Sequence, residues 1–190
     1  MSDRTGVATT VLVAAAAGLL ALSGRIEAEV PGSPVPQSAQ TLAVLGLPLL
    51  LGARRGLFSL GLWLVLGALG APVFAGGAGG FDVLLGPSSG YLLGFVLAGG
   101  LAGWCSDRHD ELAGLHRPSG FMARVGLALI GHAVILACGA LFLAPRIGAG
   151  EAWSQGVQPF LWGGVVKSAL LGLAAPWSQR PSGSQTRPSS

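Results

Sequence analysis

The stretch GLFSLGLWLVLGALGAPVFAGGAGGFDVLLGPSSGYLLGFVLAGGLAGW, from Gly56 to Trp104, contains a single charged side chain, Asp82. Two apolar runs, 56–71 and 91–104, flank a central segment in which glycine is frequent. That segment, 72–90, is too irregular to cross a bilayer and too apolar for an ordinary solvated loop. Irregular backbone is tolerated at membrane depth only where protein buries it or where it lines a cavity. The segment is therefore our first candidate for a binding site.

The composition of the whole chain indicates a membrane protein. Of the 190 residues, 51% are hydrophobic and only 10% are charged, whereas a soluble domain carries about 25% charged residues. A water-soluble core made from half of so short a chain would leave too little polar surface to cover it. These numbers argue against a soluble enzyme, a disordered chain and a nucleic-acid-binding domain. Cys105 and Cys138 lie in or beside apolar runs, so we expect free thiols and no disulfide.

Apolar runs predict an all-α, polytopic membrane protein with six transmembrane helices in one domain, residues 1–176. The second run is short for a ~30 Å hydrocarbon core, and Arg54 and Arg55 predict a polar turn directly after it. Prolines make 25–40 a loop, and 106–124 is predicted as a charged loop. We predict a disordered cytoplasmic tail over 177–190, which is rich in serine and proline. The predicted spans are 6–23, 41–52, 56–71, 91–104, 125–143 and 157–175.

The basic residues predict the orientation of these spans. Cytoplasmic loops of membrane proteins carry an excess of lysine and arginine. With both termini cytoplasmic, Arg25 and Arg146 fall outside and a larger set falls inside. The arginines on the inner side are Arg4, Arg54, Arg55, Arg108, Arg117, Arg124, Arg180 and Arg187. We therefore predict a multi-pass protein of the cell membrane with both termini in the cytoplasm.

Lys167 is the residue that most strongly suggests a binding function. It lies roughly ten residues into the last predicted span and is the only cation there. An ammonium in hydrocarbon is costly, so such a residue usually faces a cavity, a partner or a path. The alternative is a lysine that snorkels to the interface, but the reach from mid-span is long. We favour a cavity-facing lysine, which suits a carboxylate or a carbonyl acceptor.

Other polar and aromatic residues allow two interpretations each. His132 is predicted to form a helix–helix hydrogen bond rather than a ligand contact. Asp82 is either a solvated loop-tip charge or a site residue, and Trp63 either stacks on a ligand or packs in the core. In the first span, the small residues Ala14 and Gly18, and Ala17 and Ala21, are four apart. Such pairs form a flat groove for another helix, whether of this chain or of a partner.

The sequence lacks the motifs of common enzymes. Lys167-Ser168 is not preceded by the glycine that a phosphate-binding loop needs. The three histidines have no metal-site spacing with one another or with cysteine. Ser88-Ser89 has no neighbouring histidine or lysine in the sequence. We therefore predict no enzyme activity, no cofactor and no metal.

Four collinear segments carry a family resemblance. They are PVPQSAQTL from Pro34, GALGAPVFAGGAGG from Gly67, LGPSSGYLLGF from Leu85 and GVQPFLWGGVVK from Gly156. Together they resemble the signature of the BioY family, the biotin-specific substrate-binding (S) component of energy-coupling factor (ECF) transporters. The resemblance implies a six-helix S-component-like bundle with a biotin cavity near the outer side. It also implies two kinds of partner, a transmembrane coupling protein and two ATPase subunits.

The resemblance also implies roles for particular residues. The small residues of the first helix, Ala14, Ala17, Gly18 and Ala21, are expected to meet the coupling protein. The expected ligand-binding residues are Lys167, Ser88, Ser89, Tyr91, Trp63, Phe74, Gly79, Gly80, Gln40 and Asp82.

The chain departs from the family pattern at several of these positions. Gly164 stands where the family usually has an aspartate, which is expected to help bind the ureido ring of biotin. Trp162 stands for a proline, Ser88-Ser89 for Thr-Gly, and Trp63 for a tyrosine. Loss of the carboxylate removes a hydrogen-bond acceptor, at a cost of roughly a few kcal/mol if nothing replaces it. The alternatives are an S component for another vitamin or a biotin precursor, or a divergent membrane protein with a relic cavity.

Overall fold

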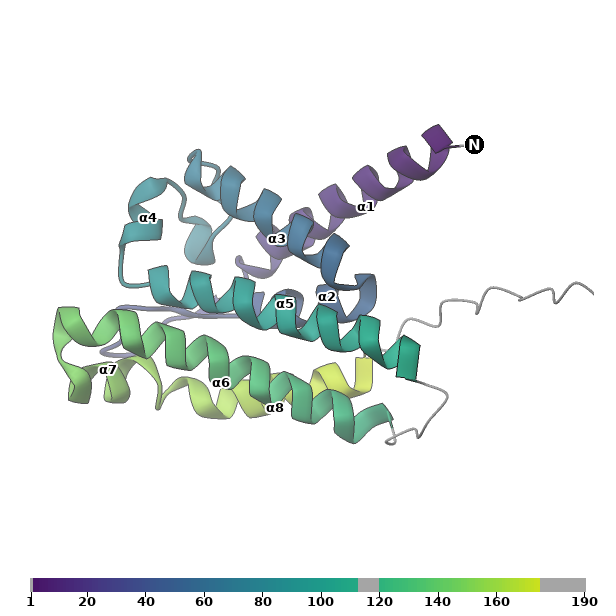
Figure 1. The fold of residues 1–190 in the computed structure, drawn as a ribbon. Coiled ribbons are helices and arrows are strands. Elements are labelled where there is room, and N and C mark those ends of the chain that lie inside the picture. The colour runs from purple at the N-terminus through teal and green to yellow at the C-terminus, as the bar shows by residue number, and fades with distance from the viewer. Residues whose placement is uncertain (1, 113–119, 175–190) are drawn as a thin grey trace, which may run out of the picture.

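The computed structural model describes residues 2–112 and 120–174, and in these ranges the chain forms a bundle of helices (Figure 1). Helices α5 and α6 lie side by side, with α8 against α6 and with α1, α2 and α3 on the α5 side (Figure 1). The helices are α1 (Ser2–Ser23), α2 (Gln40–Leu51), α3 (Ala53–Ala68), α4 (Phe81–Leu85), α5 (Ser89–Leu112), α6 (Gly120–Ile147), α7 (Ala149–Gly156) and α8 (Phe160–Ala174). A 3-10 turn, η1 (Ala75–Gly77), precedes α4, and the two-residue strands β1 (Glu27–Ala28) and β2 (Gln37–Ser38) pair antiparallel.

The predicted helical class is confirmed, whereas the number of membrane spans is only partly supported. Within the described ranges, three helices are long and apolar enough to cross a membrane, over Gly6–Ser23, Ser89–Arg108 and Phe121–Ile147. Helices α7 and α8 meet at a bend of 45° and count as a fourth span if they form one broken crossing. Helix α2 is a shorter apolar helix of 12 residues.

The polar turn predicted at Arg54 and Arg55 is wrong. The chain turns instead at Gly52, whose φ of 82° lies in the region that glycine adopts without strain. Both arginines then belong to the first turn of α3, where they are exposed. Gly52 alone makes the turn between α2 and α3. The two arginines are therefore exposed on the surface of a helix and not in a loop.

The charged loop predicted over 106–124 is wrong for 106–112 and 120–124, because α5 continues to Leu112 and α6 begins at Gly120. Polar residues near the end of α5 find partners on neighbouring helices. Ser106 Oγ donates to the Leu49 carbonyl at 2.7 Å, and Asp107 Oδ2 accepts from the Ala53 amide at 2.9 Å. A carboxylate is a favourable acceptor for the amides at the start of α3, which have no partner within that helix. Asp107 therefore links α5 to α3 and remains part of α5.

Glycines allow α5 to approach its neighbours closely on two sides. A Cβ atom at Gly94 would lie 2.8 Å from Ile135 Cα of α6, and one at Gly99 would lie 3.1 Å from the Val44 carbonyl oxygen of α2. Small residues permit such close backbone approach between membrane helices. Helix α5 is therefore held between α6 and α2 by backbone proximity.

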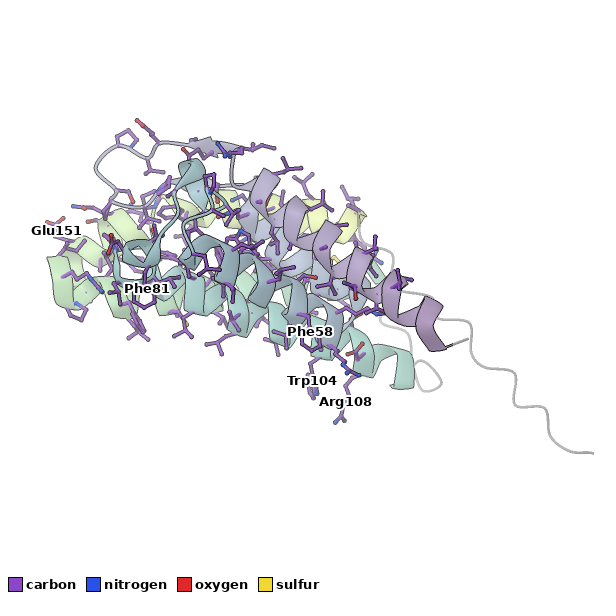
Figure 2. The ribbon with its side chains drawn as sticks, turned by 90° about the horizontal axis from the view of Figure 1, so that it is seen from above. Phe58, Phe81, Trp104, Arg108 and Glu151 are labelled. Atoms are coloured by element: carbon purple, nitrogen blue, oxygen red, sulfur yellow. The ribbon has the colours of Figure 1, made fainter. Side chains whose placement is uncertain are left out.

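The connections between helices divide the molecule into two ends. The α1–α2 connection, the segment from α3 to α5 and helix α7 lie at one end, and the N-terminus of α1 points to the other (Figure 1). Figure 2 shows Phe81 and Glu151 at the first end and Phe58, Trp104 and Arg108 at the second. The Arg108 guanidinium lies over the Trp104 ring at 5.1 Å from its centroid. We call the first end, which carries 24–39, 69–88 and 148–159, the loop end.

Candidate ligand-binding cavity

A cavity of about 380 Å³ lies at the loop end. Its wall combines the α1–α2 connection, the segment before α5, and one face each of α2, α5, α6 and α8. The lining residues are Val35, Pro36, Gln37, Ser38, Gln40, Thr41, Phe74, Ala75, Ala78, Asp82, Val83, Gly86, Pro87, Ser88, Tyr91, Leu92, Phe95, His132, Ile135, Leu136, Phe160, Gly164 and Lys167. Segments far apart in the sequence therefore form one site.

The α1–α2 connection forms one side of the cavity and is tied to α8. Lys167 Nζ donates to the Ser38 carbonyl at 2.5 Å, across 129 positions of sequence. The Gln37 side chain lies so close to Gly163 that it would have to move if residue 163 carried a Cβ atom. Proline in this connection restricts the backbone, and β1–β2 pairing fixes the register of Gln37 opposite Ala28. The connection is thus an ordered part of the binding site.

The glycine-rich segment before α5 is held in place by hydrogen bonds to its backbone. Both Gln40 Nε2 and Trp63 Nε1 donate to the Val73 carbonyl, at 3.1 and 2.9 Å. The next residue, Phe74, is buried, packs edge-on against Trp63 with ring centroids 5.1 Å apart, and lines the cavity. Gly76 adopts a φ of 67°, which favours glycine at this turn. The segment is irregular, as its composition predicts, and it lines a cavity.

Aromatic rings form much of the apolar wall. Phe74 comes from the irregular segment, Tyr91 and Phe95 from α5, and Phe160 from the start of α8. The Tyr91 and Phe160 ring centroids are 6.2 Å apart. The Tyr91 hydroxyl donates to the Gly156 carbonyl at 2.6 Å, which satisfies its polar atom in a buried position. The wall can hold a flat apolar group against several rings.

The polar groups of the wall are few and come from different elements. Lys167 is half-buried, and Asp82 is exposed at the rim of the cavity. Thr41 Oγ1 and His132 Nε2 are buried without a hydrogen-bond partner among the described residues. Across the same described part of the chain, no three histidine, cysteine, aspartate or glutamate side chains are placed to hold a metal ion. The site can therefore bind a small ligand with an apolar body and a few polar atoms.

The structure brings together six of the ten predicted ligand-binding residues and leaves four outside the wall. Those in the wall are Gln40, Phe74, Asp82, Ser88, Tyr91 and Lys167. Those outside it are Trp63, Ser89, Gly79 and Gly80.

The four residues outside the wall have physical reasons for their placement. Trp63 is fully buried behind Phe74, so it packs in the core and supports the wall from behind. Gly79 lies so close to the Ala71 carbonyl that no Cβ atom would fit there, while Gly80 makes a turn with φ 107°. Ser89 begins α5, and its hydroxyl is buried away from the cavity. The sequence motif spans these residues without indicating which of them face inward.

The sequence analysis did not predict several wall residues. Phe160 precedes Lys167 by seven positions, so helical spacing from Lys167 would have identified it. Gly164, three positions before Lys167, lies in the wall at the position where the resemblance places the family's aspartate. His132 was expected to bond between helices, and its Nδ1 does contact Ser168 Oγ of α8 at 3.1 Å. Its ring also lines the cavity. The sequence does not predict this, because a single polar residue in an apolar run does not show which way its side chain points.

The small residues of α1 divide between two faces. Ala14 and Gly18 are exposed, and no atom lies within 4 Å of the position of a Cβ at Gly18. Ala17 is buried in the core and Ala21 packs against it. Ala17 is therefore not on the free face of α1, because helical spacing turns it toward the bundle. The predicted tail, 177–190, lies outside the described residues.

A bundle of apolar helices, with a mainly apolar cavity at one end that a few polar side chains line, defines a membrane-embedded protein that binds a small solute. The family model described as the BioY family matches residues 1–182. The chain belongs to the BioY family.

Relatives and a solved structure agree with this assignment. A protein of Pyrococcus horikoshii named probable biotin transporter BioY is 35% identical over 164 residues, which are 86% of this chain and 91% of the relative. The biotin transporter BioY of Rhizobium etli is 37% identical over 149 residues, 74% of this chain and 78% of the relative. A crystal structure of the S-component for biotin from an ECF-type ABC transporter superposes with a TM-score of 0.78, at 25% identity and 91% coverage of each chain.

Proposed function

We propose that this protein binds biotin as the substrate-binding component of an ECF-type vitamin importer in the cell membrane. The observation that carries the proposal is the cavity of about 380 Å³, which has four aromatic rings in its wall and Lys167 on one side. Pockets for small ligands are typically of this size, mostly apolar, with a few oriented polar groups. Biotin matches these features because it joins a compact bicyclic ring to a flexible chain that ends in a carboxylate.

In this proposal each kind of side chain in the wall has its own role. The rings of Phe74, Tyr91, Phe95 and Phe160 contact the apolar part of biotin. The Lys167 ammonium donates to a ligand oxygen, either a carboxylate or the ureido carbonyl. Because Lys167 also holds Ser38, ligand binding and closure of the α1–α2 connection involve the same side chain.

We also propose the membrane arrangement. Residues 1–176 form a single domain with six crossings, in which α2 and α3 are short spans and α7–α8 is a broken one. The loop end, which carries the cavity, faces outward and both termini face the cytoplasm. Arginines at the opposite end support this orientation: Arg108 is exposed there, and the exposed Arg54 has its guanidinium over the Phe58 ring at 6.0 Å from the centroid. Biotin then enters from outside and binds beneath the α1–α2 connection.

Partners supply the energy in this proposal, because the sequence lacks a phosphate-binding loop of its own. A transmembrane coupling protein contacts α1, and two ATPase subunits act on the coupling protein. The exposed pair Ala14 and Gly18 forms the small-residue surface that permits close approach of another helix.

Biotin binding to the purified protein in detergent tests the proposal. We expect saturable binding of radiolabelled biotin at micromolar ligand or below. Lys167→Met should weaken binding by roughly 10- to 150-fold, because a hydrogen bond to a charged group contributes about 1.5–3 kcal/mol. Val166→Met is the matched control, since it places the same residue at the adjacent, outward-facing position. Folded protein that binds no biotin at micromolar ligand would contradict the proposal.

A second candidate is an S component for a different small ligand, such as a biotin precursor or another vitamin. Gly164 favours it, because this cavity-lining position offers no carboxylate to the ligand. Competition of labelled biotin by precursors and other vitamins separates the two candidates. Stronger competition by another compound than by unlabelled biotin would favour the second one.

A further inference from the structure

His132 is a buried polar residue at the edge of the cavity whose two ring nitrogens differ in their surroundings. Only 7% of the residue is exposed. Nδ1 lies 2.9 Å from the Ala128 carbonyl oxygen and 3.1 Å from Ser168 Oγ. Nε2 is buried and has no partner among the described residues. The imidazole is thus anchored on one side and unsatisfied on the other.

The contacts of Nδ1 determine which nitrogen carries the proton. A carbonyl oxygen only accepts hydrogen bonds, so the contact with Ala128 places a hydrogen on Nδ1. Ser168 Oγ donates to the Gly164 carbonyl at 2.8 Å, which leaves its lone pairs free to share the Nδ1 hydrogen. In the neutral imidazole, Nε2 then carries a lone pair and is an acceptor.

The location of this acceptor points to the ligand. His132, Gly164 and Lys167 all line the cavity. A Cβ atom at Gly164 would lie 3.4 Å from His132 Cδ2, the carbon bonded to Nε2. Because residue 164 is glycine, α8 places no side chain against this carbon of the ring. A buried acceptor without a partner costs about as much as a lost hydrogen bond, which a ligand donor would recover.

We propose that His132 Nε2 accepts a hydrogen bond from an N–H group of the bound ligand and thereby selects ligands with a urea- or amide-type N–H. The inference rests on the proposed function, in which that donor is a ureido nitrogen of biotin. His132 is then a specificity residue held in position by α6 and α8.

Two substitutions separate this role from a structural one. In His132→Asn, the amide reaches the position of Nδ1 and can keep the Ala128 contact, but it has no atom at the position of Nε2. In His132→Gln, the longer side chain can place an amide oxygen near the position of Nε2. We expect His132→Asn to weaken biotin binding by about 10-fold and His132→Gln to restore most of it.

Ligand analogues test the same contact from the other side. Biotin methylated at one or the other ureido nitrogen lacks one N–H donor. Wild-type protein should bind one of the two analogues about 10-fold more weakly than biotin. In His132→Asn, methylation of that nitrogen should add little further loss, because the acceptor is already gone. Equal penalties for methylation in both proteins would overturn the inference.

A spectroscopic measurement detects the contact in the wild-type protein itself and needs only one folded variant for assignment. The protein is labelled with ¹⁵N-histidine, and the His132 signals are assigned by their absence from His132→Gln, or from His132→Asn if the first variant does not fold. Addition of biotin should move the Nε2 resonance toward the range of a hydrogen-bonded nitrogen, and the N-methylated analogue should not. An unchanged Nε2 resonance in biotin-saturated protein would overturn the inference alone, whereas failure of the wild type to bind biotin would overturn the proposed function as well.

Discussion

Replacement of Gly94 by alanine tests the close contact of α5 and α6. A Cβ atom at this position would lie 2.8 Å from Ile135 Cα, 3.2 Å from the Ile135 carbonyl oxygen and 3.2 Å from Cys138 Cβ. Ordinary contact begins near 3.4 Å, so the nearest atom is about 0.6 Å too close (3.4 minus 2.8). That atom belongs to the backbone of α6 and cannot rotate away. The two helices must therefore separate.

The magnitude follows from comparison with a second glycine. Overpacking of a close contact costs about 1–3 kcal/mol, while alanine favours the helix over glycine by about 1 kcal/mol. Gly126→Ala in α6 gains the helix propensity of alanine without overpacking, because no atom lies within 4 Å of the position of its Cβ. The propensity difference cancels between the variants, so Gly94→Ala should be less stable than Gly126→Ala by about 1–3 kcal/mol.

Thermal unfolding of the detergent-solubilised variants measures this difference. At about 2–4 °C per kcal/mol for a chain of this size, the melting temperature of Gly94→Ala should be about 2–12 °C below that of Gly126→Ala. Both are followed by circular dichroism at one scan rate, since unfolding of a membrane protein is often irreversible. If Gly94→Ala melts at or above the temperature of Gly126→Ala, the helices are not in the tight contact described.

Three further predictions concern the site and its support. Tyr91→Phe should lower the free energy of unfolding by about 1–3 kcal/mol, because it leaves the buried Gly156 carbonyl without its partner; a melting temperature within 1 °C of wild type would contradict the role of this hydrogen bond. Trp63→Phe should weaken biotin binding, because the Val73 carbonyl beside Phe74 loses the indole N–H that donates to it; unchanged affinity would show that Phe74 keeps its place without this hydrogen bond. Ala17→Leu should destabilise the isolated protein by about 1–3 kcal/mol, whereas Ala14→Leu should leave its stability and biotin binding intact but reduce co-purification with the coupling protein. The opposite pattern would contradict the assignment of the two faces of α1.

A site residue could be predicted from the sequence where its own neighbours in the chain indicate its role, and not where the role depends on distant segments. Lys167 was identified from the sequence, because a cation within an apolar span is costly wherever the helix lies. Ser88, Tyr91 and Phe74 followed from a family resemblance. Trp63 was equally compatible with packing and ligand contact, and its burial behind Phe74 depends on a hydrogen bond to a loop that irregular sequence does not predict.

The sequence by itself determined the membrane class, the helical architecture and the family. Those properties depend on sums over many residues: the scarcity of charge, the length of apolar runs and four collinear motifs. The tertiary structure alone decided which nitrogen of His132 is free, which face of α1 is exposed, and that Lys167 holds Ser38. Each of these depends on contacts between residues distant in sequence, whose geometry is set by the packing of helices and is not encoded in any local pattern.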